Sequence, residues 1–170
     1  TISLCGITTI GSTANAELLQ TTALNETEIS EKINTYLAEF SQFSSRAPGT
    51  EGEKQASEYI FNKLSGFSGL SPKKLNGIKD EDGIQNFTFT SRFDGKLKHS
   101  QNIIFEYKTN KKDAKKVILA CSYDGYALDD EGKIINTEAI NGSAGSVAVL
   151  LALAENIASL NQDINYEFIF

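Results

Sequence analysis

The 170-residue sequence is short of residue types on which many functional classes depend. Its two cysteines, Cys5 and Cys121, are too few for a disulfide framework. The net charge is −6 and there is no basic patch, which argues against nucleic-acid binding. No apolar run approaches the roughly 20 residues that a transmembrane span needs. What is left is an ordinary globular composition, long enough for one domain with a real core.

Histidine is also scarce. The chain has one, His99, in the polar stretch KLKHSQN that precedes a predicted strand. Histidine is the commonest metal ligand in proteins. Because no partner ligands accompany it, we expect His99 to be solvated and not to bind a metal.

The first residues, TISLCGITTIGSTANA, are mildly apolar and uncharged, and they end in small residues. This is the form of a secretory apolar region followed by a cleavage site, although a Ser/Thr-rich leader would look similar. We therefore expect 1–16 to be a residual signal-peptide segment, 17–25 a linker, and 26–170 the N-terminal part of an α/β domain. The protein is then secreted or extracytoplasmic. The final segment, INYEFIF, is too apolar for a free end, so we expect the fold to continue beyond it and this piece alone to be poorly soluble.

Hydrophobic periodicity predicts alternating helices and strands. Helical spacing is found at 26–40, from Thr50 or Gly52 to 64, and at about 143–160, and strand patterns at 84–90, 102–108, 117–121 and 164–170. The strand at 117–121 is apolar throughout, which is typical of burial on both faces. The last strand–helix–strand unit predicts a parallel crossover. The predicted fold class is α/β: a mixed, largely parallel sheet flanked by helices and incomplete at the C-terminus.

The apolar strand at 117–121 stops at Ser122-Tyr123-Asp124. In open α/β sheets, ligands bind at the carboxyl ends of strands, so Asp124 is a candidate catalytic or anchoring acid. The alternative is a loop residue that accepts backbone N–H bonds from the turn after it.

A second candidate is NGSAGS, at the start of the third predicted helix. Its backbone could approach a ligand at the helix N-terminus, with Asn141 and Ser143 as binding residues. Alternatively the segment only caps the helix, with Ser143 as N-cap.

Several segments resemble one family, the secreted di-zinc aminopeptidases (peptidase family M-28) and their relatives. They follow the family's order from about residue 26 onward: SRAPGTEGEKQASEYIFNKL, QNF, SQNIIFEYKT, KKVILACSYDGY, NGSAGSVAVLLALAENIA and INYEFIF. The resemblance implies a phosphorylase/hydrolase-like fold of the Zn-exopeptidase type. It also implies two zinc ions that activate a water for attack on a peptide carbonyl. Arg46 to Thr50 lies outside that metal centre and is assigned to a structural turn.

The resemblance shows what this chain carries at the family's ligand positions. The family's ligand His corresponds to Ser122, and the Asp that orients this histidine corresponds to Asp124. The bridging Asp corresponds to Gly142. Glycine offers no ligand and a serine hydroxyl is a poor substitute for imidazole, so no zinc or other cofactor is expected. Asp129 and Asp130 could replace the bridging Asp, although their loop, with a turn through Gly132, reads as solvated.

Three hypotheses follow. The first is a secreted or surface protein that keeps the peptidase fold without a normal metal site and binds an unknown protein partner. The second is an active zinc metallo-aminopeptidase that releases N-terminal amino acids from peptide substrates, with its remaining site residues beyond Phe170. The third is an unrelated α/β binding domain.

Overall fold

The computed structural model describes residues 26–43, 45–77, 81–91, 94–125, 127–131, 133–135, 143–160 and 163–170. The predicted signal segment 1–16, the linker 17–25 and the predicted site positions Asn141 and Gly142 lie outside these residues. Within them, no helix has the length and apolar character to cross a membrane.

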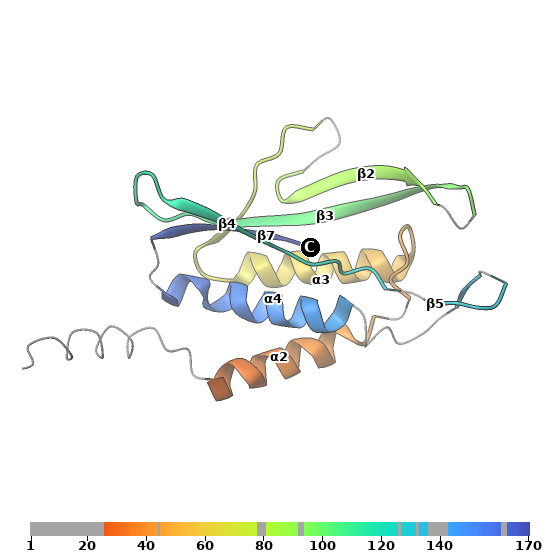
Figure 1. Cartoon of the computed structure of the whole chain (residues 1–170), viewed down its shortest axis with the longest axis horizontal. Coiled ribbons are helices and arrows are strands. Elements are labelled where there is room, and N and C mark those ends of the chain that lie inside the picture. Colours follow the sequence, from red (N-terminus) through yellow and green to blue (C-terminus); the bar gives the residue numbers. More distant parts are fainter. Residues whose placement is uncertain are drawn as a thin grey trace, which may run out of the picture.

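The described chain is a mixed sheet with helices on one face (Figure 1). The elements are α2 Glu26–Phe40, α3 Glu51–Gly66, β1 Leu70–Pro72, β2 Ile84–Thr90, β3 Leu97–Tyr107, β4 Lys115–Ala120, β5 Ala127–Leu128, β6 Ile134–Ile135, α4 Gly145–Asn156, the short 3-10 helix η2 Ile157–Leu160, and β7 Ile164–Ile169. Helices α3 and α4 lie under the sheet, and α2 packs on α4 (Figure 1). The predicted α/β class is confirmed.

The main sheet has the strand order β1-β3-β7-β4, with β2 paired to β3. Strand β3 runs antiparallel to β1, β2 and β7, whereas β4 runs parallel to β7. Helix α4 connects this parallel pair, as the sequence predicted. Because parallel strands end at the same edge, Ala120 lies beside Ile169, and the residues that follow β4 lie next to Phe170.

The core lies between the sheet and the helices. Helix α2 buries Tyr36 and Phe40 there, consistent with the helical spacing of apolar residues at 26–40, and β3 contributes Phe105 from the sheet. Helix α3 buries Ala56, Ile60 and Leu64, and α4 buries Val147, Ala148, Leu150, Leu151, Ala152 and Ala154. Each large apolar side chain fully buried in this way contributes about 1.5–3 kcal/mol.

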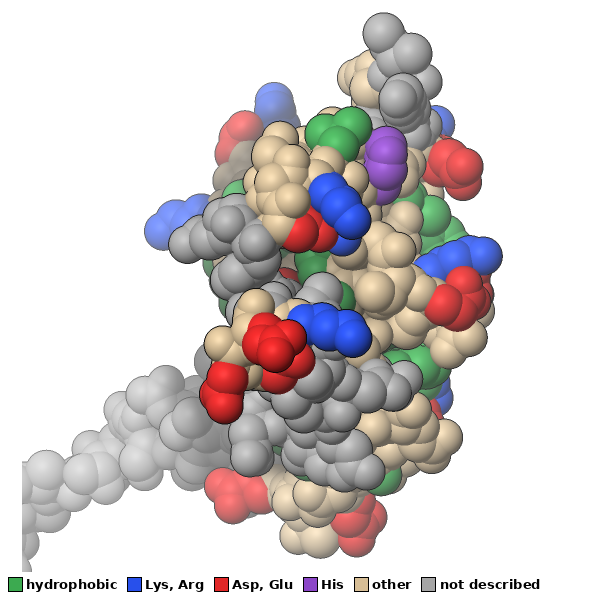
Figure 2. Space-filling model, turned by 90° about the vertical axis from the view of Figure 1, so that its right-hand side faces the viewer, with side chains coloured by type: hydrophobic (Ala, Val, Ile, Leu, Met, Phe, Trp, Pro, Cys, Tyr) green, Lys and Arg blue, Asp and Glu red, His purple; other side chains and the backbone are tan. Residues whose placement is uncertain are grey.

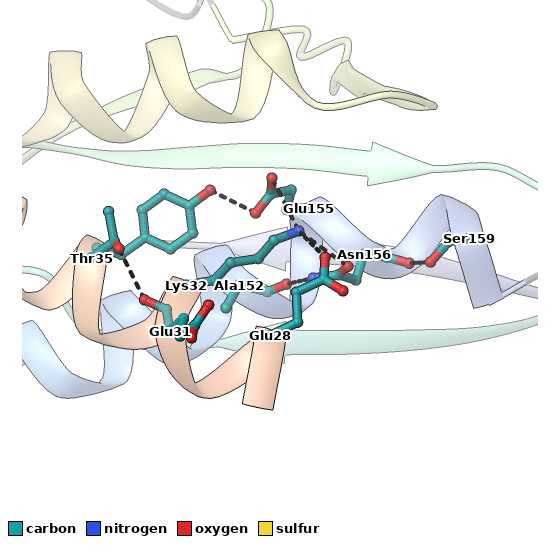
Figure 3. Close-up of polar contacts among 9 residues, drawn as sticks. Glu28, Glu31, Lys32, Thr35, Ala152, Glu155, Asn156 and Ser159 are labelled. Atoms are coloured by element: carbon teal, nitrogen blue, oxygen red, sulfur yellow. Dashed lines mark hydrogen bonds and ion pairs between the residues drawn. The ribbon is translucent and has the colours of Figure 1, made fainter. Parts of the chain in front are cut away.

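Polar contacts fix α2 on α4 (Figure 3). The Tyr36 hydroxyl donates to Glu155 at 2.8 Å, and burial raises the pKa of this tyrosine. Lys32 bridges to Glu155 at 3.3 Å and donates to Asn156 at 3.4 Å. These contacts join α2 to the last turn of α4.

Strand β4 corrects one prediction, because it is not buried on both faces. It is an edge strand of the described sheet, with β7 on one side only. Ile118 is 57% exposed, and Val117 and Leu119 are half-buried. Among the described elements, the helices lie on one face of the sheet (Figure 1). An apolar run shows that a strand is compatible with burial. Whether other elements cover both of its faces depends on the rest of the fold and cannot be predicted from the run itself.

Short strands were also missed. Strand β1 lies between the predicted helix that ends at 64 and the predicted strand at 84–90. The β5–β6 hairpin lies between the predicted strand at 117–121 and the predicted helix at about 143–160. Strand β3 begins at Leu97, five residues before the predicted start. Strands of two or three residues show too few alternations for a pattern to reveal them.

Candidate functional site

A cleft of about 430 Å³ opens at the carboxyl ends of β4 and β7. Its walls are mostly apolar, and its few polar groups include the predicted site residues Ser122 and Asp124. The lining residues are Pro48, Phe87, Phe89, Ser100, Gln101, Asn102, Cys121, Ser122, Tyr123, Asp124, Ile169 and Phe170. This is the position at which open α/β sheets bind their ligands. Figure 2 views the molecule from this end, where the visible charged side chains of both signs are scattered and form no large patch of one sign.

Two phenylalanines of β2 form one wall of the cleft. Phe87 and Phe89 are two residues apart, so the strand pleat places both side chains on the same face. Their ring centroids are 6.2 Å apart, and Phe87 is 40% exposed. The strand pattern predicted at 84–90 places them together, and in the structure they line the cleft with the strand-end residues.

The chain after β4 alternates between core and cleft. Tyr123 is buried, and its hydroxyl donates to the carbonyl of Gln101 at 3.1 Å. Burial raises the pKa of this tyrosine. Ser122 on one side of it is exposed, and Asp124 on the other is half-buried. Tyr123 therefore anchors the chain after β4 in the core, while Ser122 and Asp124 on either side of it line the cleft.

Arg46 is the residue of the site that sequence reasoning missed. It is completely buried, its guanidinium lies 4.7 Å from the Phe40 ring centroid, and its Nη1 donates to the Phe43 carbonyl at 3.1 Å. Burial lowers the pKa of Arg46, and the Asp124 charge acts in the opposite direction. Its position before a Pro-Gly turn indicated only a turn, which the structure confirms, with Gly49 at a φ of 82°. Nothing local signals burial, because arginine is rarely buried.

Ser143 is not the N-cap of α4. Ala144 precedes the helix with helical angles, φ −59° and ψ −41°, and no side chain caps it. The Ser143 hydroxyl instead donates to the Asp124 carbonyl at 2.6 Å and accepts from Arg46 Nη2 at 3.2 Å. The structure thus brings Ser143 and Asp124 together, although through the backbone of Asp124. The backbone bonds expected for the Asp124 carboxylate stay a prediction, because Tyr126, in the turn that follows it, lies outside the described residues.

Solved structures share this fold. The chain is similar to a leucine aminopeptidase precursor from Bacteroides thetaiotaomicron (22% identity, TM-score 0.63), a glutaminyl cyclase from Tannerella forsythia (18%, 0.65) and a Zn-dependent exopeptidase from Parabacteroides distasonis (20%, 0.63). The fold is that of the zinc-dependent exopeptidases and glutaminyl cyclases. Each match covers 82% of this chain but 45% of the other, so the chain spans less than half the length of these proteins. No family model and no curated protein matches the chain.

Zinc is the metal that the exopeptidase fold implies, and the donors at the strand end do not fit it. A zinc site needs imidazole, thiolate or carboxylate ligands in close array. The cleft presents the hydroxyl of Ser122, the carboxylate of Asp124 and the thiol of Cys121. Burial raises the pKa of Cys121 to about 12, so this thiol stays protonated. In the described ranges, no three His, Cys, Asp or Glu side chains lie together as a metal site would require.

The remaining candidate ligands lie elsewhere in the exopeptidase fold. His99 is on β3 and lines a different hollow, beside Gly49. Asp129 lies in the β5–β6 hairpin, where its carboxylate accepts from the backbone N–H groups of Glu131 at 3.0 Å and Lys133 at 2.8 Å. The interpretation of Asp129 as a turn residue is confirmed. Asp130 follows it in the same turn.

Proposed function

We propose that this is a secreted or surface protein in which the exopeptidase fold acts as a non-catalytic binding domain. The observation that carries this proposal is the donor set at the end of β4. Ser122, at the family's histidine position, lines the cleft with an exposed neutral hydroxyl. The family's bridging Asp position is Gly142, which has no side chain to offer. In metal sites generally, removing a group that only orients a ligand weakens metal binding about 10–100-fold. Here two ligand positions are themselves changed, so we expect a larger loss of metal affinity.

A cleft of this kind suits binding without catalysis. Apolar walls with a few convergent polar groups are typical of sites that recognise a ligand by shape and a small number of hydrogen bonds. The partner under this proposal is a protein or peptide segment that presents an apolar side chain to the phenylalanine wall. Secretion rests on the N-terminal segment alone, and N-terminal sequencing of the mature protein tests it. A mature chain that still contains residues 1–16 contradicts it.

The alternative is an active zinc metallo-aminopeptidase that releases N-terminal amino acids from peptides. Asp124, the position that orients the ligand histidine in the family, favours this alternative because it is present and lines the cleft. Its metal ligands would then be unusual, and others would come from a longer chain.

Zinc content and peptidase activity separate the two. The full-length protein is dialysed against metal-free buffer, analysed for zinc by elemental analysis, and assayed with aminoacyl-nitroanilides. We expect no stoichiometric zinc and no chelator-sensitive turnover. The double variant Ser122→His, Gly142→Asp is the matched comparison, and we expect it to retain more zinc than the parent. Two tightly held zinc ions in the parent, with turnover that a chelator abolishes, would sink the proposal.

A further inference from the structure

We infer that Arg46 is a positioning residue of the cleft: it holds the segment 122–125 against the residues that lead into α4. The inference rests on the proposed function only in taking this cleft as the binding site. The contacts themselves do not depend on what the cleft binds.

The guanidinium joins segments that are far apart in the sequence. Arg46 Nε donates to the Tyr123 carbonyl at 2.8 Å, and Nη2 donates to the Ser143 hydroxyl at 3.2 Å. That hydroxyl in turn donates to the Asp124 carbonyl at 2.6 Å. The backbone adds a bridge, because the Arg46 N–H donates to the Gly125 carbonyl at 2.8 Å. Three consecutive carbonyls of the strand-end segment are therefore fixed, directly or through one hydroxyl.

Only arginine suits this geometry. Its guanidinium is a rigid planar fork with five donors, so one side chain can serve several acceptors in fixed directions. A lysine ammonium at the same place carries the charge but cannot reproduce the fork. A turn between two helices does not need a charged side chain. Burying a charge costs several kcal/mol unless the charged group is well hydrogen-bonded. Positioning of the segment accounts for a buried cation that a structural turn alone does not.

The segment borders a built-in probe. Cys121 lies immediately before it, is half-buried and lines the cleft. We expect its thiol to react slowly while the segment is held, since the side chain is half-buried and burial raises its pKa. If Arg46 is removed, the Tyr123 carbonyl loses its donor, and the Ser143 hydroxyl that serves the Asp124 carbonyl loses the group that orients it. The segment can then leave the cleft while the helices stay docked. The Cys121 thiol then becomes solvated and reacts faster.

The test measures alkylation of Cys121 by iodoacetamide in the native full-length protein, read by peptide mass spectrometry. For Arg46→Met we expect the rate to rise at least about tenfold, the factor expected when bonds to a buried charged group are lost. Arg46→Lys should remain well above the parent, because it restores the charge and not the fork. Tyr36→Phe is the matched control. It removes an α2–α4 hydrogen bond and leaves the segment untouched, so its rate should stay close to that of the parent.

Ser143→Ala decides the matter if the arginine variants do not fold. It deletes only the hydroxyl that relays Arg46 to Asp124, and we expect about a fivefold faster alkylation. An unchanged rate in Ser143→Ala overturns the inference. So does a rate in Arg46→Met that the Tyr36→Phe control matches, or a full return to the parent rate in Arg46→Lys. None of these outcomes involves zinc or a ligand, so the result stands apart from that of the zinc and peptidase assays.

Discussion

Single buried polar residues tie α3 to the sheet beside the cleft. Glu53 is 5% exposed, and its carboxylate accepts bonds from the Gly49 N–H and the Ser100 hydroxyl. In return the Thr50 hydroxyl, at the N-cap of α3, accepts from the Glu53 N–H at 3.3 Å. This arrangement is close to a capping box, in which side chains and backbone satisfy each other at a helix start. Glu53 therefore serves the helix end and the neighbouring strand together.

Replacing Glu53 should be costly. We expect Glu53→Ala to lower the free energy of unfolding by about 2–3 kcal/mol, because it removes a cap and leaves buried donors without their acceptor. Glu51→Ala, an exposed change in the same helical turn, should cost less than about 0.5 kcal/mol. Urea denaturation of both variants measures the difference. Equal stabilities would show that the buried carboxylate contributes nothing.

At this scale the sequence predicts residues with local signatures. Thr50 precedes a helical pattern and Asp124 follows an apolar strand, so both could be placed before the structure was known. The burial of Arg46 could not be predicted, because two of its hydrogen-bond partners lie 77 and 97 residues away in the chain. The interpretation of Ser143 as a cap failed for the same reason. A hydroxyl near a helix start can bond the first backbone N–H groups of that helix. The Ser143 hydroxyl instead bonds the distant Arg46 guanidinium and Asp124 carbonyl.

Among the elements, β7 carries a buried acid between two basic partners. Glu167 is 3% exposed, accepts from Lys73 at 2.8 Å and pairs with Lys116 of the neighbouring strand. Burial raises the pKa of the Glu167 carboxyl, but the bonds from Lys116 and Lys73 outweigh it and hold the pKa below its usual range. The ionised form is therefore favoured in the folded protein, and it links β7 to β4 and to the residue after β1.

This lowered pKa predicts acid sensitivity. A carboxyl with a lower pKa folded than unfolded contributes stability that is complete above its unfolded value, near pH 4.3, and is lost as the pH falls through the folded value. We therefore expect the free energy of unfolding to drop more steeply between pH 5 and about pH 3 in the parent than in Glu167→Gln. Urea denaturation across this range tests it. Parallel pH profiles for the two proteins would contradict the assignment.

Element prediction succeeded where the hydrophobic period was long. The bounds of α2 and β2 match the predicted 26–40 and 84–90 residue for residue. The parallel crossover through α4 was also predicted, since an apolar strand, an apolar helix and a second apolar strand allow few other arrangements. The exposure of β4 at the sheet edge was not predicted, because composition alone does not show which strands and helices will lie next to a strand.

For the molecule as a whole, the described sheet has one face on helices and one apolar edge strand without an outer neighbour. Such edges invite association with other chains unless charges protect them. Lys115 and Lys116 protect the beginning of β4, whereas Ile118 is 57% exposed further along it.

A charge at this position should reduce association. We expect Ile118→Lys to raise solubility and lower the apparent mass of the 26–170 protein in light scattering at high concentration. Val149→Lys is the matched control, because Val149 is similarly exposed, at 51%, but lies on α4. If the two variants behave alike, the strand edge is not what associates. If the parent 26–170 protein unfolds cooperatively as a monomer, the expectation that this piece associates and is poorly soluble is wrong.

The parallel pairing of β4 with β7 also has a kinetic consequence. Lys115 pairs with Ile164, so the chain must close a long loop before the first of these contacts forms. Non-local parallel pairing of this kind is slow compared with the local hairpin of β2 and β3. The cleft has walls from both strand ends and from Pro48, so it exists only after that closure. Binding competence should then appear in the last phase of folding, and a partner that occupies the cleft would slow unfolding more than it speeds folding.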